Sequence, residues 1–414
     1  MRDRTPTRAL ENGALRYGVY AEDGSLLRYE YLALEDDPAD PGTELSKATL
    51  LQDSTEVSLF GSAANRTIDE AFAGIAGQLK LIMSNMATIT LTVQDAKGKP
   101  IPEVLVQGIL SESGQAVYTN ASGVATGYIG EGSQVIKISG YADIEDYNET
   151  LAVVKGTTIT KILTLTTRNF LGITSSQSVK FSGNVDTIDY SVTSGGGGGG
   201  SGCYLGGGGG SGGDTSVQSG QSVMHNVAYP AIIGAGGFGG GISYGLTSVV
   251  SGQNPGENGG QSSFMGTSPS GGKGGKSSST DSSGGTGGVT GGAGGTGWHS
   301  GVPQNPETSG KASTAAAYTA FGTVSNLGGG GGGGCKSRSS SEYSTDGGQI
   351  GGGRGGLGYG ISKFHATSGA ANTGGGGGGG GGLSDDDDDN HRGYPGGSGG
   401  SGFIGIRMHL KSAA

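Results

Sequence analysis

The second half of this 414-residue chain is so rich in glycine that an ordinary hydrophobic core cannot form there. Only 18 of the 94 glycines precede residue 191, which leaves 76 for the remaining 224 residues. The longest blocks are Gly195–Gly200, Gly206–Gly210, Gly328–Gly334 and Gly374–Gly382. A run of glycines has no side chain to bury and loses the most backbone entropy on ordering. Such a region is therefore either disordered or packed backbone against backbone.

The residues between the glycine blocks favour a folded domain. A flexible Gly/Ser linker is uniform in composition, whereas short apolar and aromatic stretches such as 244–250 and 318–324 separate these blocks. Two strand-like stretches also frame the region, 185–192 before it and 403–410 after it. Strands in those positions can pair and tie the ends of a domain together. We therefore predict that the glycine-rich region is folded.

Besides the glycine blocks, this half of the chain contains the stretches Tyr229–Gly237, Gly259–Phe264 and the closing Gly400–Ile406. With these features it resembles the glycine-rich domains of tail-fibre adhesins and minor structural proteins of tailed phages and prophages. The resemblance implies that the blocks form extended left-handed helices of the polyproline II type, packed hexagonally. It also implies that the loops between the blocks bind the bacterial surface.

The first 86 residues resemble an attachment module. Strand-like stretches at 15–20 and 26–32 flank a polar turn and predict a hairpin. The stretches Gly42–Leu51 and Leu59–Gly61 resemble a pattern that recurs in prophage tail and baseplate proteins. The resemblance implies that this module docks the chain onto phage tail or baseplate proteins.

A short helix is predicted after this pattern. Thr67 and Glu70 fit a capping box, and the apolar residues that follow step by four and three positions, as in a coiled-coil seam. These residues are Ile68, Phe72, Ile75, Leu79 and Ile82. The stripe fits either a helix packed on its own hairpin or the seam of a parallel homotrimer, the symmetry expected of a phage fibre.

Residues 87–167 predict a small β-sandwich. Ile89, Leu91 and Val93 alternate with polar residues and share one strand face. Further short strands follow at the spacing typical of sandwiches. The stretches Val93–Pro102 and Tyr118–Val124 resemble carboxypeptidase-regulatory-like, immunoglobulin-like domains. The resemblance implies a spacer, with weak carbohydrate binding as the alternative.

Charge and motifs argue against several classes of protein. The first 190 residues hold 24 acidic and 15 basic residues, and the remainder holds 11 and 10, so no basic face for nucleic acid is predicted. The five histidines have no metal-ligand spacing, and the glycine tracts match catalytic and nucleotide-binding motifs only through their composition. We predict no enzyme activity, no cofactor, no metal site and no membrane insertion. The N-terminus lacks the apolar stretch of a signal peptide, so we expect synthesis in the host cytoplasm, release by lysis and a place in the virion tail.

Residues predicted to touch a receptor lie in the stretches between glycine blocks. Exposed aromatic residues suit both sugar faces and protein surfaces, and a run of five aspartates should form a solvated loop. By analogy with the phage adhesins, the candidates are Trp298, His299, Tyr343, Tyr359, Asp385, Asp386, Asp387, Asp388, Asp389, His391, Arg392 and Tyr394. Cys203 and Cys335 follow similar glycine tracts, and both free thiols and a disulfide formed after release remain open.

The sequence thus predicts a mainly β protein in three parts. These are a small α/β attachment module with a short helix over 1–86, an Ig-like sandwich over 87–167, and a glycine-rich distal adhesin domain over 168–414. In that last part, packed extended left-handed polyglycine helices are framed by β-strands. The predicted function is a phage tail receptor-binding adhesin that attaches to a host cell-surface glycan or outer-surface protein. The alternatives are a structural virion protein without receptor contact and a surface adhesin of the bacterium itself.

Overall fold

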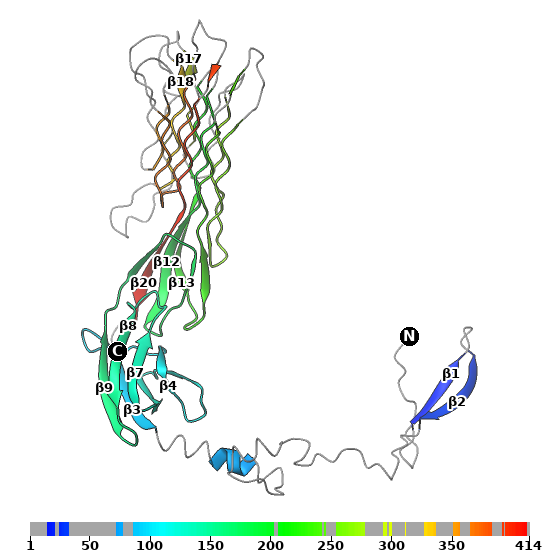
Figure 1. Cartoon of the computed structure of the whole chain (residues 1–414), viewed down its shortest axis with the longest axis vertical. Helices are drawn as coiled ribbons and strands as arrows, with labels where there is room; N and C mark the ends of the chain where they lie inside the picture. The colour runs from blue at the N-terminus through cyan, green and yellow to red at the C-terminus, as the bar shows by residue number, and fades with distance from the viewer. Residues whose placement is uncertain are drawn as a thin grey trace. The chain divides into compact units, whose positions relative to one another are not determined.

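A computed structural model of the chain describes a defined set of residues (Figure 1). The chain divides into two compact units, Met1–Asn85 and Met86–Ala414. The described residues are 15–20, 25–32, 72–77, 86–202, 206–241, 244–245, 254–277, 293–295, 298–299, 311, 327–336, 351–356, 365–382, 391–392 and 394–411.

The first unit contains the predicted hairpin. β1 (Leu15–Tyr20) and β2 (Leu26–Leu32) pair antiparallel, with an irregularity between Val19 and Tyr20. A helix spans residues 72–77. Two residues of the predicted seam lie on it and are exposed, Phe72 at 65% and Ile75 at 38%. The other seam residues, Ile68, Leu79 and Ile82, lie outside the described residues.

The second unit begins with a seven-stranded sheet. Its strands are β3 (Ala87–Asp95), β4 (Leu105–Leu110), β5 (Ala116–Tyr118), β6 (Val124–Ile129), β7 (Gly132–Ile138), β8 (Tyr147–Val153) and β9 (Thr158–Leu165). They follow the order β8-β7-β4-β6-β3-β9, with β5 paired to β4, and β9 runs parallel to β3. An ion pair between Lys161 of β9 and Glu149 of β8 bridges the two ends of this order. The expected sandwich is therefore one continuous sheet that nearly closes on itself.

The apolar alternation of β3 creates the core of this sheet. Ile89, Leu91 and Val93 are fully buried, as their period of two predicts. They pack with residues of the other strands into one cluster that includes Ile136, Ile138 and Leu163. Two tight turns connect strands of this sheet, because the Gly98 amide donates to the Asp95 carbonyl and the Gly123 amide donates to the Asn120 carbonyl.

The two framing strands pair with each other. β12 (Val185–Thr193) and β20 (Phe403–Leu410) are antiparallel neighbours in a sheet of order β10-β20-β12-β13, which confirms the expected closure of the domain. β10 (Phe170–Ile173) and β13 (Thr215–Ser222) are its edges. A second sheet contains β11 (Gln177–Val179), β14 (Tyr229–Ile232) and β16 (Ser263–Phe264). The two sheets enclose a second apolar cluster around Phe181, Phe264 and Ile406.

The first glycine block continues from β12 as extended backbone bonded with a three-residue period. Three successive amides of the block donate to three different segments. The next three amides donate to the same three segments in the same order. The acceptors for Gly195 to Gly197 are the carbonyls of Gly260, Gly400 and Ser211, and those for Gly198 to Gly200 are the carbonyls of Glu257, Gly397 and Gly208. The acceptor numbers fall by three as the block advances, so these neighbours run antiparallel to it.

Three more segments donate to the same block and run parallel to it. The donor pairs are Gly272 and Gly275, Gly237 and Gly240, and Gly377 and Gly380, with N···O distances of 2.8–2.9 Å. A chain with three residues per turn and six bonded neighbours has the hexagonal packing expected of polyproline II helices. No residue of Gly195–Gly200 has a positive φ, in agreement with this conformation. The predicted packing of polyglycine helices is therefore confirmed.

The longest glycine block, Gly374–Gly382, is a second centre of this packing. Hydrogen bonds join it to six segments. These are 195–202, 206–213, 328–334, 351–356, 365–370 and 394–402. We call the packed extended segments between β12 and β20 the glycine bundle. They are drawn as the wavy traces between β12 and the pair β17–β18 in Figure 1.

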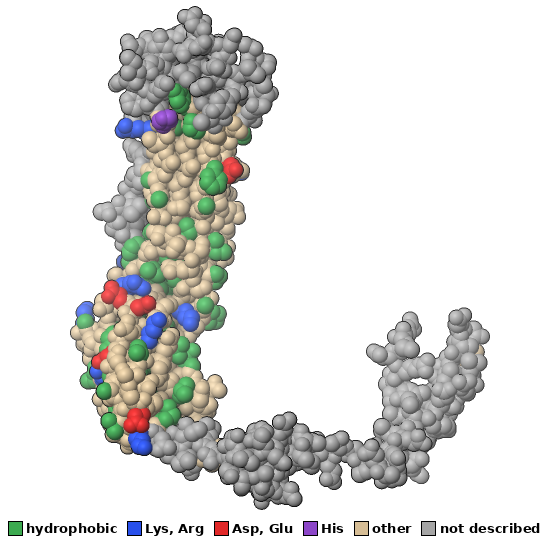
Figure 2. Space-filling view, viewed as in Figure 1, with side chains coloured by type: hydrophobic (Ala, Val, Ile, Leu, Met, Phe, Trp, Pro, Cys, Tyr) green, Lys and Arg blue, Asp and Glu red, His purple; other side chains and the backbone are tan. Residues whose placement is uncertain are grey.

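Outer segments of the glycine bundle carry side chains where inner segments cannot. In the segment 234–241 the exposed positions recur every third residue and include Ala235 and Phe238. In the segment 271–277 they are Lys273 and Lys276. Figure 2 shows that this face of the bundle presents mostly backbone and uncharged residues, while most of the charged side chains lie below the bundle, over the sheets.

Candidate functional site

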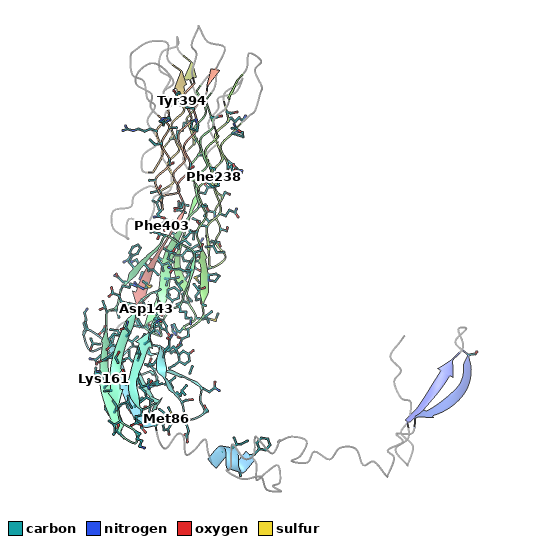
Figure 3. All side chains as sticks on the ribbon, in the orientation of Figure 1. Met86, Asp143, Lys161, Phe238, Tyr394 and Phe403 are labelled. Carbon is teal, nitrogen blue, oxygen red and sulfur yellow. The ribbon has the colours of Figure 1, made fainter. Side chains whose placement is uncertain are left out.

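One end of the glycine bundle collects residues from separate parts of the chain. The blocks 195–202, 328–334 and 374–382 run parallel, as their bonded registers show, so they finish at the same end. We call this the loop end, and the opposite end, where β12 and β20 meet the bundle, the sheet end. Figure 3 labels Phe403 at the sheet end, Phe238 partway along and Tyr394 toward the loop end.

Two short strand pairs lie at the loop end. β17 (Trp298–His299) pairs parallel with β18 (Cys335–Lys336), which follows the block 328–334 directly. β19 (His391–Arg392) pairs antiparallel with β15 (Tyr244–Gly245). Four of the predicted receptor-binding residues, Trp298, His299, His391 and Arg392, are therefore held in paired backbone rather than in isolated loops.

Tyr394 joins these strands to the rigid bundle. Its amide donates to the Gly381 carbonyl at 3.1 Å, and its carbonyl accepts from the Gly202 amide at 3.0 Å. Its ring meets the ring of His365 edge to face, with centroids 5.5 Å apart. Because hydrogen bonds to two central glycine blocks hold its backbone, the position of Tyr394 is set by the glycine bundle.

The other predicted receptor residues cannot be placed. Tyr343, Tyr359 and the run Asp385–Asp389 lie outside the described residues, and so does Cys203. The assignment of these residues to a receptor contact therefore stays a prediction, as does the state of Cys203 and Cys335.

A polar junction joins the seven-stranded sheet to the sheets that support the bundle. The buried Asp143 carboxylate accepts the Ser182 amide at 3.1 Å and the Ser182 hydroxyl at 2.5 Å. Desolvation by burial raises the pKa of Asp143 above its usual value, and the Ser182 hydrogen bonds and Arg168 oppose the shift. The Arg168 guanidinium in turn donates to the carbonyls of Ala142, Tyr141 and Ile144.

A second set of bonds crosses the same junction. The Tyr141 hydroxyl accepts the Leu105 amide at 2.7 Å and donates to the Asn226 side-chain oxygen at 2.6 Å. Burial raises the pKa of Tyr141 to about 12, so it stays protonated at neutral pH. The Asn226 amide side chain donates to the Glu103 carbonyl at 2.7 Å. Both Glu103 and Asn226 have positive φ, 55° and 61°, a conformation that these surrounding bonds maintain.

These junction residues were not found by sequence reasoning. Asp143, Ser182 and Asn226 are common polar residues, and no local pattern marks them as partners. The sequence does contain a pattern that could have predicted the outer segments of the glycine bundle. The repeats Gly-Gly-Lys at 271–276 and Gly-Gly-Ser at 396–401 have the three-residue period of a polyproline II helix with one exposed side.

The described part of the chain holds no group of three or more His, Cys, Asp or Glu residues able to bind a metal ion. Nor does that part contain a helix that is both long and apolar enough to span a membrane. The paired strands at the loop end contain aromatic, histidine and cationic residues, and the backbone of Tyr394 is bonded to the glycine bundle.

The fold and the site together define a protein in which a bundle of polyglycine helices carries two short strand pairs at its loop end. A family model described as a glycine-rich domain matches residues 173–409, more than half of the chain. The chain belongs to this glycine-rich domain family.

A crystal structure of a DUF3823 family protein from Bacteroides ovatus is 14% identical, with a TM-score of 0.17, and the match covers 46% of this chain and 98% of the other. A search of curated proteins found no match.

Proposed function

We propose that this protein is a receptor-binding adhesin of a phage tail, in which the loop end of the glycine bundle contacts the host cell surface. The observation that carries the proposal is the convergence of β15, β17, β18 and β19 at one end of the glycine bundle, whose inner segments have no room for side chains. Binding residues are commonly displayed in this way, on short segments positioned by a rigid scaffold.

The proposed mechanism is multivalent attachment. Each loop end would make weak contacts through aromatic and cationic residues such as Trp298 and Arg392. Several copies on one tail would raise the overall avidity without any new contact. The homotrimer and the docking of residues 1–86 on tail or baseplate proteins belong to this proposal, as does location in the virion.

The proposal is tested by labelling a panel of bacterial isolates with the fluorescent full-length protein and counting cells by flow cytometry. We expect strain-selective labelling that falls at least tenfold in the double variant Trp298→Ala/His299→Ala and in Arg392→Ala. The matched control is Glu112→Ala, on an exposed turn of the seven-stranded sheet, which should label as well as the wild type. Labelling that is absent, or equal in all variants, would contradict receptor binding by the loop end.

Two other functions are distinguished by where the protein is found. A structural virion component would be detected by antibody on phage particles but would label no cells. A surface adhesin of the bacterium itself would be detected on growing cells that release no phage.

A further inference from the structure

We infer that a cavity beside the sheet end of the glycine bundle is a binding site for a neutral hexopyranoside, separate from the loop end. The cavity has a volume of about 420 Å³, within the range of small-molecule sites. Its lining residues are Tyr229, Pro230, Ser263, Phe264, Met265, Gly266 and Ser268. The inference does not depend on the function proposed above.

The aromatic wall of this cavity is rigid. The Tyr229 ring lies 5.7 Å from Phe181 and 6.4 Å from Phe264, measured between ring centroids. Phe264 in turn meets Tyr190 edge to face at 5.1 Å. The Tyr229 hydroxyl accepts the Met224 amide at 2.7 Å. Because packing and this bond hold the half-buried Tyr229, a ligand would not have to order it on binding.

A strained tight turn that begins at Phe264 also lines the cavity. The Phe264 amide donates to the Thr267 carbonyl at 3.0 Å, and the Thr267 amide donates to the Phe264 carbonyl at 2.9 Å. Between them, Met265 and Gly266 have φ of 47° and 79°, which is typical of a type I′ turn. This turn prefers Asn or Gly at its first central position, so Met265 is an unfavourable choice for local structure. A residue held in such a conformation beside a cavity is a reason to look for a ligand.

The polar groups at the cavity identify the class of ligand. Within the described residues, the hydroxyls of Ser263 and Ser268 have no hydrogen-bond partner, and the Tyr229 hydroxyl hydrogen has no acceptor. None of the seven lining residues is charged. A pyranose ring has an apolar face, which suits Tyr229 and Pro230, and a rim of hydroxyls, which suits the two serines. Uncharged walls favour a neutral sugar over an anionic one.

The site is tested by saturation-transfer NMR on the full-length protein. The probes are methyl β-glucopyranoside, methyl β-galactopyranoside and N-acetylglucosamine, each at millimolar concentration. We expect saturation transfer to the ring protons of at least one probe. We expect a loss of at least fivefold in Ser268→Trp, because Ser268 is exposed at the rim and an indole there would fill the cavity. Glu112→Trp, which adds the same ring to a distant exposed turn, should leave the signal unchanged.

A second variant separates binding from folding. Met265→Asn supplies a residue that the turn prefers, so the turn should form, although the variant loses the packing of Met265 against the second apolar cluster. The side chain that lines the cavity also changes, so the transfer should fall. Absence of transfer to every sugar in the wild type would overturn the inference, as would equal transfer in the wild type and Ser268→Trp. Transfer to cyclohexylmethanol but to none of the sugars would assign an apolar ligand and would also overturn it.

Discussion

Gly199 faces the carbonyl oxygen of Gly378 so closely that a Cβ atom built on Gly199 would lie 2.0 Å from that oxygen. The obstacle is backbone in a neighbouring helix, which cannot rotate away as a side chain can. We therefore expect Gly199→Ala to destabilise the glycine bundle by at least the 1–3 kcal/mol typical of overpacking. Thermal unfolding followed by differential scanning fluorimetry measures this loss.

The matched control for that substitution is Gly241→Ala. Gly241 is exposed at the end of an outer segment, its φ is not positive, and a Cβ there meets nothing within 4 Å among the residues that the structure describes. We expect a change within about 1 kcal/mol, in the stabilising direction, because alanine restricts the unfolded chain. Equal melting temperatures for the two variants would be incompatible with close backbone packing at Gly199.

The buried Asp143 predicts a specific dependence of stability on pH. Because burial raises its pKa in the folded state, the folded protein holds this proton more tightly than the unfolded chain does. Its contribution to stability therefore grows as the pH falls toward 3.8 and is lost as the pH rises through the raised folded pKa. Each unit of that rise in pKa corresponds to about 1.4 kcal/mol.

Two substitutions at Asp143 separate its charge from its hydrogen bonds. Asp143→Asn keeps an oxygen that accepts the Ser182 amide, and its NH2 group would donate to the Ser182 hydroxyl oxygen where the carboxylate accepted from it. We therefore expect stability at pH 7 no lower than wild type and a weaker dependence on pH. Asp143→Ala leaves the buried Ser182 amide without its acceptor and should cost about 1–3 kcal/mol. Urea unfolding at pH 4, 5.5 and 7 measures these effects, and a wild type that loses stability relative to Asp143→Asn on acidification contradicts the account.

Tyr141 predicts a stability effect at the junction between the sheets. Tyr141→Phe removes the hydroxyl that accepts the Leu105 amide and donates to Asn226. We expect a loss of about 1–3 kcal/mol, since the part-buried Leu105 amide then loses its acceptor. Tyr118→Phe is the control, because Tyr118 is 46% exposed and should change stability by less than about 0.5 kcal/mol. Similar urea midpoints for the two variants would show that the junction bond contributes nothing.

The exposed face of the helix 72–77 predicts self-association. If Phe72 and Ile75 belong to a trimer seam, the double variant Phe72→Ser/Ile75→Ser should convert a trimer into a monomer at micromolar concentration. Ala76→Ser, on the same helix and also exposed, should leave the trimer intact. Size-exclusion chromatography with light scattering reports the mass, and a wild-type monomer would refute the trimer.

Much of the architecture could be predicted because local patterns specify it. The alternation of Ile89, Leu91 and Val93 predicts one buried strand face, and the strands at 185–192 and 403–410 pair as their framing positions suggest. The parallel pairing of β9 with β3 was not predicted, since the partner of a strand depends on tertiary packing rather than on local sequence.

The candidate site could be predicted only in part, for a physical reason. Aromatic and histidine residues such as Trp298 and His391 are visible as interruptions of the glycine blocks. Their convergence at one end depends on which blocks are neighbours and in which direction each block runs. A run of identical glycines carries no information on that register. The cavity beside Tyr229 and Met265 was missed because its walls come from two strands, β14 and β16, more than 30 residues apart.

Hydrogen exchange of the full-length protein, followed by mass spectrometry, tests the packing of the glycine blocks most directly. The amides of Gly376 to Gly380 all donate to backbone carbonyls at 2.8–3.0 Å, as do those of Gly195 to Gly200 at 2.8–2.9 Å. Peptides spanning these two central blocks should therefore retain deuterium-exchange protection for minutes to hours. Complete exchange within seconds, as in an unstructured linker, would contradict the backbone lattice.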